Sequence, residues 1–220
     1  MPAPIKTSTA REQILGKIRK ALIAHSLSQP FPEADPRAQE PVFAKADSAP
    51  DELFATKFVG LGGKYLYCDN EQEMLDQLHA LCEIRGWRKV FCAGDELLQL
   101  CRNNKLDFIE APDPADDSAD ACITGCEAVV ARTGSFLISS RQQLGRTAPV
   151  FYPVHLVVVY KNQVVPDIAD GLRLLSDKYK TQLPSMISLQ TGPSRTADIE
   201  KTLVTGVHGP KEVFCFYINA

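Results

Sequence analysis

The sequence lacks grouped cysteines. Its seven cysteines contain no C-x-x-C pair, and the closest two, Cys122 and Cys126, stand four positions apart. Iron–sulfur and structural zinc sites draw their ligands from tighter groups, so the spacing predicts neither a cluster nor a metal site in this chain. Several of the cysteines lie in apolar periodic segments, where a thiol acts as a small hydrophobe, and we expect reduced, buried thiols.

A long apolar run and an excess of positive charge are also missing. The longest near-apolar segment, 154–160, has seven residues and contains His155, whereas about 20 residues span a bilayer. The first residues, MPAPIKTSTAREQ, lack the apolar core of a signal peptide. The 24 Lys and Arg residues face 27 Asp and Glu residues, a net charge of −3, which argues against a nucleic-acid partner. These absences predict a cytoplasmic protein without a membrane span.

Glycine-rich nucleotide motifs are absent as well. The run GLGGK at 60–64 invites a phosphate-loop interpretation, but the P-loop needs a glycine where Phe58 stands. The dinucleotide fingerprint fails in the same way at Tyr65. Since the run precedes a predicted strand, we interpret it as the end of a helix over 51–60.

The composition that is present, 45% apolar and 23% charged over 220 residues, is typical of one globular domain with an appendage. Residues 9–25 show the period of an amphipathic helix, with an apolar stripe that includes Ile14, Ile18 and Leu22. Five prolines between 26 and 50 predict an extended linker. We therefore expect an N-terminal helix and linker over 1–50 and a main domain over 51–220. Whether the helix folds back on its own domain or packs on another subunit is left open.

From residue 51 onward, helix and strand patterns alternate, which predicts an α/β fold with a parallel-rich sheet flanked by helices. Asn70 and Gly86 delimit one of the helices as N-cap and C-terminal signal. Further helices are predicted over 95–102 and 167–182. Residues 132–135 read as a hairpin turn between strands. The predicted strands cover 64–68, 89–93, 106–110, 128–131, 136–139, 155–160, 185–190 and 213–218.

The most informative stretch is 191–211, TGPSRTADIEKTLVTGVHGPK. It follows the predicted strand 185–190 and leads into a predicted short helix over about 197–204. Ligands of open α/β sheets bind at the carboxyl ends of strands, so we expect a site here. Backbone amides at a helix start, beside Arg195, suit a carboxylate or phosphate. The alternative is that Ser194, Thr196 and Asp198 only cap the helix.

Three residues of this stretch are candidates for catalysis: His208, Asp198 and Ser194. Together they suggest a hydrolytic triad, but the nucleophile elbow G-x-S-x-G is not present, because the sequence reads GPSRT at 192–196. We expect His208 and Lys211 to lie in one tight turn before the last strand. The predicted ligand-binding residues are Gly192, Ser194, Arg195, Thr196, Lys211 and Thr133.

Residues 191–211 closely resemble the signature of the lactate utilization protein C family, whose domain is called the LUD domain. Shorter supporting segments, 123–128, 133–134, 145–146 and 153–159, fall in the same order as in that family. The likeness covers roughly 51–220 and is strongest after residue 121. Arg132 departs from the family pattern, since many relatives carry an acidic residue there, and no acid–base role is transferred to it.

The resemblance implies a fold similar to sugar-phosphate isomerases and CoA transferases, with an added strand layer. It also implies a role as the non-cluster subunit of an iron–sulfur system that oxidises L-lactate to pyruvate. The implied partners are a cysteine-rich subunit and a larger iron–sulfur subunit, which would carry the clusters. Because this chain shows no redox cofactor motif, whether it is itself an enzyme is left open, as is a homo-oligomer.

A second interpretation remains beside the first. Fold relatives bind sugar phosphates, acyl-CoA or nucleotide-like anions, and a fold does not decide a function. The chain would then be a stand-alone enzyme or binding protein for such a small anionic ligand.

Overall fold

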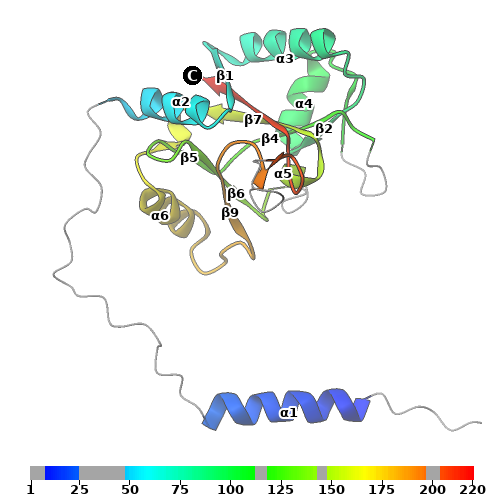
Figure 1. Cartoon of the computed structure of the whole chain (residues 1–220), viewed down its shortest axis with the longest axis vertical. Helices are drawn as coiled ribbons and strands as arrows, with labels where there is room; N and C mark the ends of the chain where they lie inside the picture. The colour runs from blue at the N-terminus through cyan, green and yellow to red at the C-terminus, as the bar shows by residue number, and fades with distance from the viewer. Residues whose placement is uncertain (1–7, 25–47, 112–117, 143–147, 197–203) are drawn as a thin grey trace, which may run out of the picture. The chain divides into compact units, whose positions relative to one another are not determined.

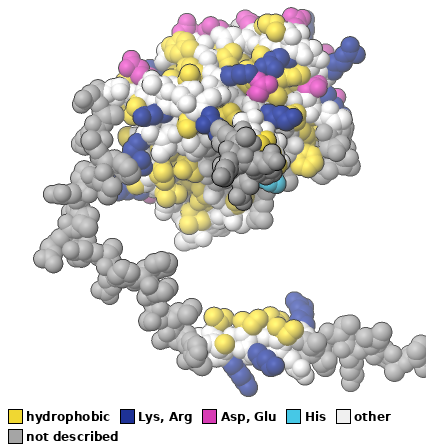
Figure 2. Space-filling view, viewed as in Figure 1, with side chains coloured by type: hydrophobic (Ala, Val, Ile, Leu, Met, Phe, Trp, Pro, Cys, Tyr) yellow, Lys and Arg dark blue, Asp and Glu magenta, His cyan; other side chains and the backbone are white. Residues whose placement is uncertain are grey.

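The computed structural model describes residues 8–24, 48–111, 118–142, 148–196 and 204–220. The chain divides into two units, Met1–Lys45 and Ala46–Ala220. The first unit contains helix α1 (Ser8–Ala24), which confirms the predicted amphipathic helix. Its apolar stripe, visible in Figure 2, is solvent-exposed at Ile14, Ile18 and Leu22. Most of the predicted linker lies outside the described residues, and the domain division at residue 50 stays a prediction.

The second unit is built on a six-stranded sheet in which every pair of neighbours is parallel (Figure 1). The strand order is β1-β12-β7-β4-β2-β3. This sheet confirms the predicted α/β class. The strands are β1 (Lys64–Cys68), β2 (Val90–Ala93), β3 (Ile109–Glu110), β4 (Ala121–Thr124), β7 (Val154–Tyr160) and β12 (Glu212–Ile218).

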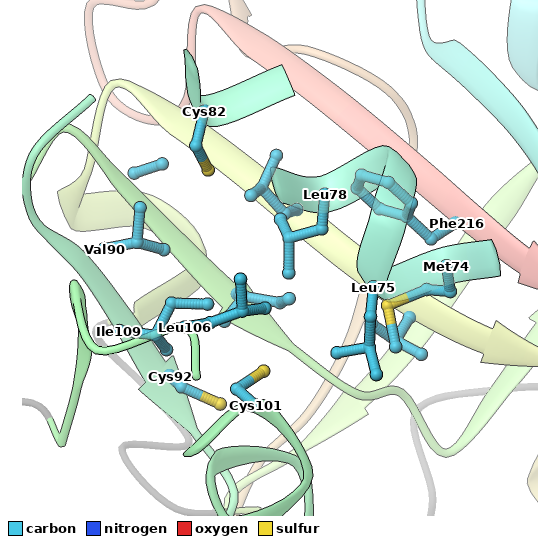
Figure 3. Close-up of a cluster of buried hydrophobic side chains, with 14 of the residues drawn as sticks. Met74, Leu75, Leu78, Cys82, Val90, Cys92, Cys101, Leu106, Ile109 and Phe216 are labelled. Carbon is cyan, nitrogen blue, oxygen red and sulfur yellow. The ribbon is translucent and has the colours of Figure 1, made fainter. Parts of the chain in front are cut away.

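Helices α3 (Glu71–Arg85) and α4 (Asp95–Asn103) cover one face of this sheet. The Asn70 side chain accepts a hydrogen bond from the Glu73 amide at 3.0 Å, and Gly86 adopts the left-handed conformation (φ +67°), so both predicted helix signals are confirmed. Figure 3 shows the apolar side of α3, with Leu78 and Cys82, packed over the sheet. Burial of this face fixes the helices against the strands.

The opposite face carries the added strand layer. A second sheet has the order β8-β5-β6-β9, and helix α2 (Pro50–Gly60) joins it against the large sheet. Alternation along β5 explains the layering: Val129 faces the large sheet, while Ala128 and Val130 face helix α6 (Ile168–Tyr179). The strands are β5 (Ala128–Val130), β6 (Ser135–Ser139), β8 (Val164–Val165) and β9 (Ile187–Gln190).

The turn between β5 and β6 confirms the predicted hairpin at 132–135, since the two strands pair antiparallel. Two short elements complete the unit around β7: α5 (Ala148–Phe151) before it and the 3-10 turn η1 (Lys161–Gln163) after it. Among the helices that the structure describes, none combines the length and the apolar character that crossing a membrane requires.

One predicted element differs in the structure. Residues 195–196 form strand β10 (Arg195–Thr196), which pairs antiparallel with β11 (Val204–Thr205). The helix predicted over 197–204 therefore does not include Val204, because the backbone there pairs with Thr196 instead of closing a helical turn. The rest of that segment lies outside the described residues.

Candidate functional site

The predicted site residues converge on a pocket of about 420 Å³, called here the amino-edge pocket. Gly192, Ser194, Arg195 and His208 all contribute to its lining. Leu61, at the end of α2, lines the same space. The sequence therefore identified residues that lie together although up to 16 positions separate them.

The pocket lies at the opposite edge of the parallel sheet from the expected one. Leu61 comes shortly before β1, and His208 comes shortly before β12. The Lys211 amide donates to the Pro153 carbonyl, just before β7 begins, at 2.8 Å. These are amino ends of parallel strands. Strand β9, which leads into the stretch, pairs antiparallel with β6 in the small sheet, so the expectation from carboxyl ends was wrong for this strand.

Backbone groups that were expected to hold an anion are engaged within the chain. The Ser194 amide donates to the Pro210 carbonyl, and the Ser194 carbonyl accepts from the Gly206 amide, both at 2.9 Å. The Arg195 guanidinium donates to the Leu61 carbonyl, one of the unpaired groups at the end of α2. Arg195 thus ties the loop to this helix end, and only its remaining N–H groups are left for a ligand.

The other predicted residues lie around this pocket. The Ser135 hydroxyl is 2.8 Å from both the Thr133 and Thr191 hydroxyls, which links Thr133 to the loop without placing it in the lining. Thr196 is part of β10, and Lys211 is exposed outside the lining. Asp198 lies outside the described residues. No hydrogen bond joins the described side chains of Ser194 and His208, so the part of the triad that can be seen is not assembled.

Arg132, the residue that departs from the family pattern, has a structural partner. Its Nε and Nη2 atoms donate to the two carboxylate oxygens of Asp167 at 2.9 and 2.7 Å. Asp167 is also the N-cap of α6. The bidentate pair joins the β5–β6 turn to the start of α6, which agrees with leaving acid–base chemistry out of this position.

A larger pocket, of about 580 Å³, lies at the carboxyl edge of the parallel sheet and is called here the carboxyl-edge pocket. Ala93 at the end of β2, Gly125 just after β4 and Tyr160 at the end of β7 line it. Sequence reasoning missed this pocket. The available signal was Gly94, a glycine between a predicted strand and a predicted helix, whose φ of +142° few other residues adopt.

Polar side chains of both signs line the carboxyl-edge pocket. Arg141 and Gln142 come from the turn after β6, while Glu71, Asp95 and Glu96 come from the starts of α3 and α4. The Tyr160 hydroxyl donates to Glu71 at 2.7 Å. Burial, followed by the hydrogen bond to Glu71 and the negative charges of Glu71 and Glu96, raises the pKa of Tyr160, so this phenol stays protonated at neutral pH.

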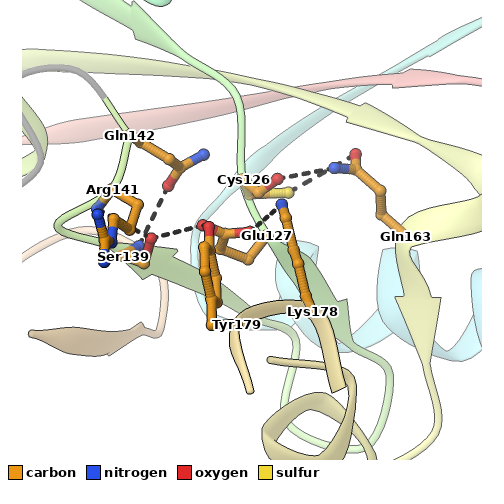
Figure 4. A network of polar contacts seen from close by, with 8 residues as sticks. All are labelled: Cys126, Glu127, Ser139, Arg141, Gln142, Gln163, Lys178 and Tyr179. Atoms are coloured by element: carbon orange, nitrogen blue, oxygen red, sulfur yellow. Dashed lines mark hydrogen bonds and ion pairs between the residues drawn. The ribbon is translucent and has the colours of Figure 1, made fainter. Parts of the chain in front are cut away.

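A buried carboxylate, Glu127, is hydrogen-bonded to Ser139, two residues before Arg141 of the lining (Figure 4). It accepts hydrogen bonds from the Ser139 and Tyr179 hydroxyls and from the Lys178 ammonium, at 2.5, 2.7 and 2.7 Å. Burial by itself would raise the pKa of Glu127, but these three donors outweigh it and hold that pKa below its ordinary value. Glu127 therefore stays ionised inside the fold.

The cysteines do not fit a cluster in this chain. All seven are free, buried thiols. Burial raises the pKa of each, to about 11 for Cys68 and Cys101 and to about 12 for Cys82 and Cys122, which opposes the thiolate that a metal needs. Within the described ranges, no three His, Cys, Asp or Glu side chains are grouped to hold a metal ion.

Comparison with known proteins finds similarity to one family. Residues 113–218 match the LUD domain. The chain is 34% identical over 98 residues to lactate utilization protein C of Deinococcus radiodurans, a match that covers 44% of this chain and 45% of that protein. It is 26% identical over 154 residues to the protein of the same name from Anoxybacillus flavithermus, covering 64% and 68%. The first of these matches thus spans less than half of the relative's length.

A solved structure shows the same fold. The crystal structure of a DUF162 family protein from Deinococcus radiodurans superposes with a TM-score of 0.58 at 19% identity, covering 78% of this chain and 99% of that one. The family match, the curated relatives and this fold agree with the signature seen in residues 191–211. The predicted resemblance is therefore confirmed: residues 113–218 match the LUD domain, and the chain is similar to proteins named lactate utilization protein C.

Proposed function

We propose that this chain takes part in lactate utilization as the non-cluster component of an iron–sulfur system that converts L-lactate to pyruvate. The observation that carries the proposal is the match of the LUD domain region to several proteins named lactate utilization protein C, at 34% identity in one case. The sequence signature of residues 191–211 and the parallel sheet of the fold agree with that relationship.

The chemistry explains why partners are needed. Oxidation of L-lactate to pyruvate releases two electrons and two protons, and a redox cofactor must accept the electrons. The buried thiols of this chain, with raised pKa values, are unsuited to holding an iron–sulfur cluster. The proposal therefore assigns the clusters to a cysteine-rich subunit and a larger iron–sulfur subunit, with this chain binding substrate or organising the complex.

The test is a clean deletion of this chain in its host, with L-lactate as the energy source and no redundant lactate dehydrogenase. We expect loss of growth, rescue by the wild-type chain, and co-purification with two partners that together reduce a dye only when L-lactate is present. Normal growth after deletion would reject the proposal. Complementation with His208→Ala asks separately whether the histidine contributes.

A second candidate function is supported by one observation: three residues predicted to bind an anion, Gly192, Ser194 and Arg195, do meet in the amino-edge pocket. The chain would then bind a phosphorylated or other anionic ligand by itself. Titration with inorganic phosphate tests this, and Arg195→Ala should weaken binding by about 10- to 150-fold if the guanidinium holds the anion. Arg195→Lys, which keeps a charge, is the matched variant.

A further inference from the structure

The carboxyl-edge pocket occupies the position where open α/β sheets bind their ligands. Neighbouring strands β2, β4 and β7 all end at its wall, through Ala93, Gly125 and Tyr160. Its volume of about 580 Å³ falls within the range of small-molecule sites. The residues predicted from the sequence lie at the other edge of the sheet, so this pocket is separate from them.

The charges of the lining restrict the ligand. Among the described lining residues Arg141 is the one cation. One Nη atom of its guanidinium donates to the Gln182 carbonyl at 3.2 Å, and the remaining N–H groups suit a single carboxylate. Glu71, Asp95 and Glu96 are carboxylates in the same lining. They would repel a second anionic group but accept hydrogen bonds from ligand hydroxyls. The lining therefore fits a ligand with one carboxylate and at least one hydroxyl better than a dicarboxylate or a phosphate dianion.

The cationic end of the pocket is held in place from behind. The Ser139 hydroxyl donates a hydrogen bond to Glu127. The same hydroxyl oxygen accepts a hydrogen bond from the Arg141 backbone amide at 3.2 Å. The Ser139 amide donates to the Gln142 side-chain oxygen, also at 3.2 Å, which leaves the Gln142 amide nitrogen as a donor. Figure 4 shows Arg141 and Gln142 extending from this turn while Glu127 anchors it. A fixed backbone places both side chains at the pocket with less entropy to lose on binding.

We propose that the carboxyl-edge pocket binds a hydroxylated monocarboxylate, with Arg141 and Gln142 on the carboxylate and the carboxylates of Glu71, Asp95 and Glu96 toward the hydroxyl side. Glu127 is a positioning residue, because it acts through Ser139. The inference rests on the proposed function only in the choice of L-lactate as one probe. D-gluconate, a longer monocarboxylate with several hydroxyls, probes the same chemistry without that assumption.

The experiment is calorimetric titration of the full chain with four probes: L-lactate, D-gluconate, propionate and L-malate. Propionate lacks the hydroxyl and L-malate adds a second carboxylate, so both should bind several-fold more weakly than L-lactate. Arg141→Gln should weaken L-lactate or D-gluconate binding by about 10-fold or more, because a charge-assisted hydrogen bond is lost. Arg173→Gln, at an arginine of α6 whose side chain is 76% exposed, is the matched control and should change nothing.

Positioning by Glu127 has its own measurement. Glu127→Gln should weaken ligand binding at a temperature where the variant still has the circular dichroism spectrum of the wild type. Arg141→Gln should weaken ligand binding without lowering the melting temperature. Binding of neither L-lactate nor D-gluconate, binding unchanged in Arg141→Gln, or tighter binding of L-malate would each overturn the inference. Binding lost in Arg195→Ala but kept in Arg141→Gln would place the ligand in the other pocket and also overturn it. A growth defect on lactate without binding here would leave the proposed function standing and reject this site alone.

Discussion

The Lys178 ammonium lies 2.7 Å from the Glu127 carboxylate, yet the lysine side chain is 54% exposed and the glutamate side chain only 2%. The pair is therefore asymmetric. If the glutamate is removed, the lysine can turn into water; if the lysine is removed, a charge stays buried. Removal of one partner is destabilising mainly through the charge that is left behind.

This asymmetry predicts unequal costs for the two sides of the pair. Lys178→Met should lower the free energy of unfolding by about 3 kcal/mol at pH 7, because the Glu127 charge keeps only two neutral donors. Glu127→Gln should cost about 1–2 kcal/mol, since the amide still accepts hydrogen bonds from Ser139 and Tyr179. Urea unfolding of both variants at pH 7 measures the difference, and equal losses would contradict it.

Lowering the pH tests whether the charge of Glu127 accounts for the stability difference. The pKa of Glu127 is lowered in the folded chain, so its contribution to stability is present above the unfolded pKa and is lost as pH falls through the folded one. The gap between wild type and Glu127→Gln should accordingly shrink below about pH 4.5. A gap that persists in acid would mean that packing, not charge, is what the substitution disturbs.

A second pH dependence comes from His155, which is 1% exposed on β7. Its Nε2 atom lies 2.8 Å from the Thr124 hydroxyl, and burial lowers its pKa to about 4. Below about pH 6.5 His155 binds a proton in the unfolded chain but not in the folded chain. The free energy of unfolding should therefore fall between pH 6.5 and 4 and then level off. The total loss is on the order of 3 kcal/mol.

His155→Gln supplies the control, because it cannot take up that proton and its side-chain amide can still reach the Thr124 hydroxyl. Urea unfolding of both chains at pH 7.5, 6 and 5 should show wild type losing more stability than the variant as pH falls. Contributions from the rest of the protein are common to both chains and cancel in the difference. Parallel curves would show that His155 is protonated in the fold.

Two glycines with nearly the same backbone conformation distinguish the cost of a steric clash from the cost of a positive φ. Gly86 (φ +67°) has nothing within 4 Å of where a Cβ would lie, while a Cβ at Gly134 (φ +63°) would lie 2.7 Å from the Phe58 backbone nitrogen. Gly86→Ala should cost about 1 kcal/mol from conformation alone. Gly134→Ala should cost about 1–3 kcal/mol more, since the β5–β6 turn must move away from α2. Thermal unfolding compares the two, and similar losses would mean that the turn yields freely.

Much of the fold was predictable because local signals and the global pattern agree. Asn70 and Gly86 delimit α3 through backbone chemistry that acts within a few residues, and the buried strand β7 is apolar along its length except for His155. The helix predicted after Arg195 was wrong at Val204 because the local signals and the tertiary structure disagree there. Its residues cap helices well, but Arg195 and Thr196 pair with Thr205 and Val204 instead. Such a pairing is a tertiary contact that spacing in the sequence does not reveal.

The site was predictable only in part for a related reason. Residues 191–211 form one continuous signature, so their meeting in a single pocket follows from proximity in the chain. The carboxyl-edge pocket takes residues from separate segments, such as Gly94, Arg141 and Tyr160. The strand order that joins them depends on crossovers between distant strands, and no short motif specifies it. Which edge of the sheet the loop reaches was equally hidden, because β9 belongs to the second sheet.

The last prediction concerns the thiols, and it tests whether clusters reside on other chains. Cys82, Cys92 and Cys101 lie in the same core, beneath α3 and α4 (Figure 3). Burial, then the charge of neighbouring groups, raises the pKa of Cys82 to about 12, and burial raises that of Cys101 to about 11, so these thiols stay protonated at neutral pH. The chain purified without oxygen should therefore be colourless and contain no stoichiometric iron or sulfide. A thiol reagent should label the native chain slowly, at a rate limited by opening of the fold, and should label all seven thiols at once in urea. Stoichiometric iron and sulfide, or rapid labelling of the native chain, would contradict the assignment of the clusters to partner subunits.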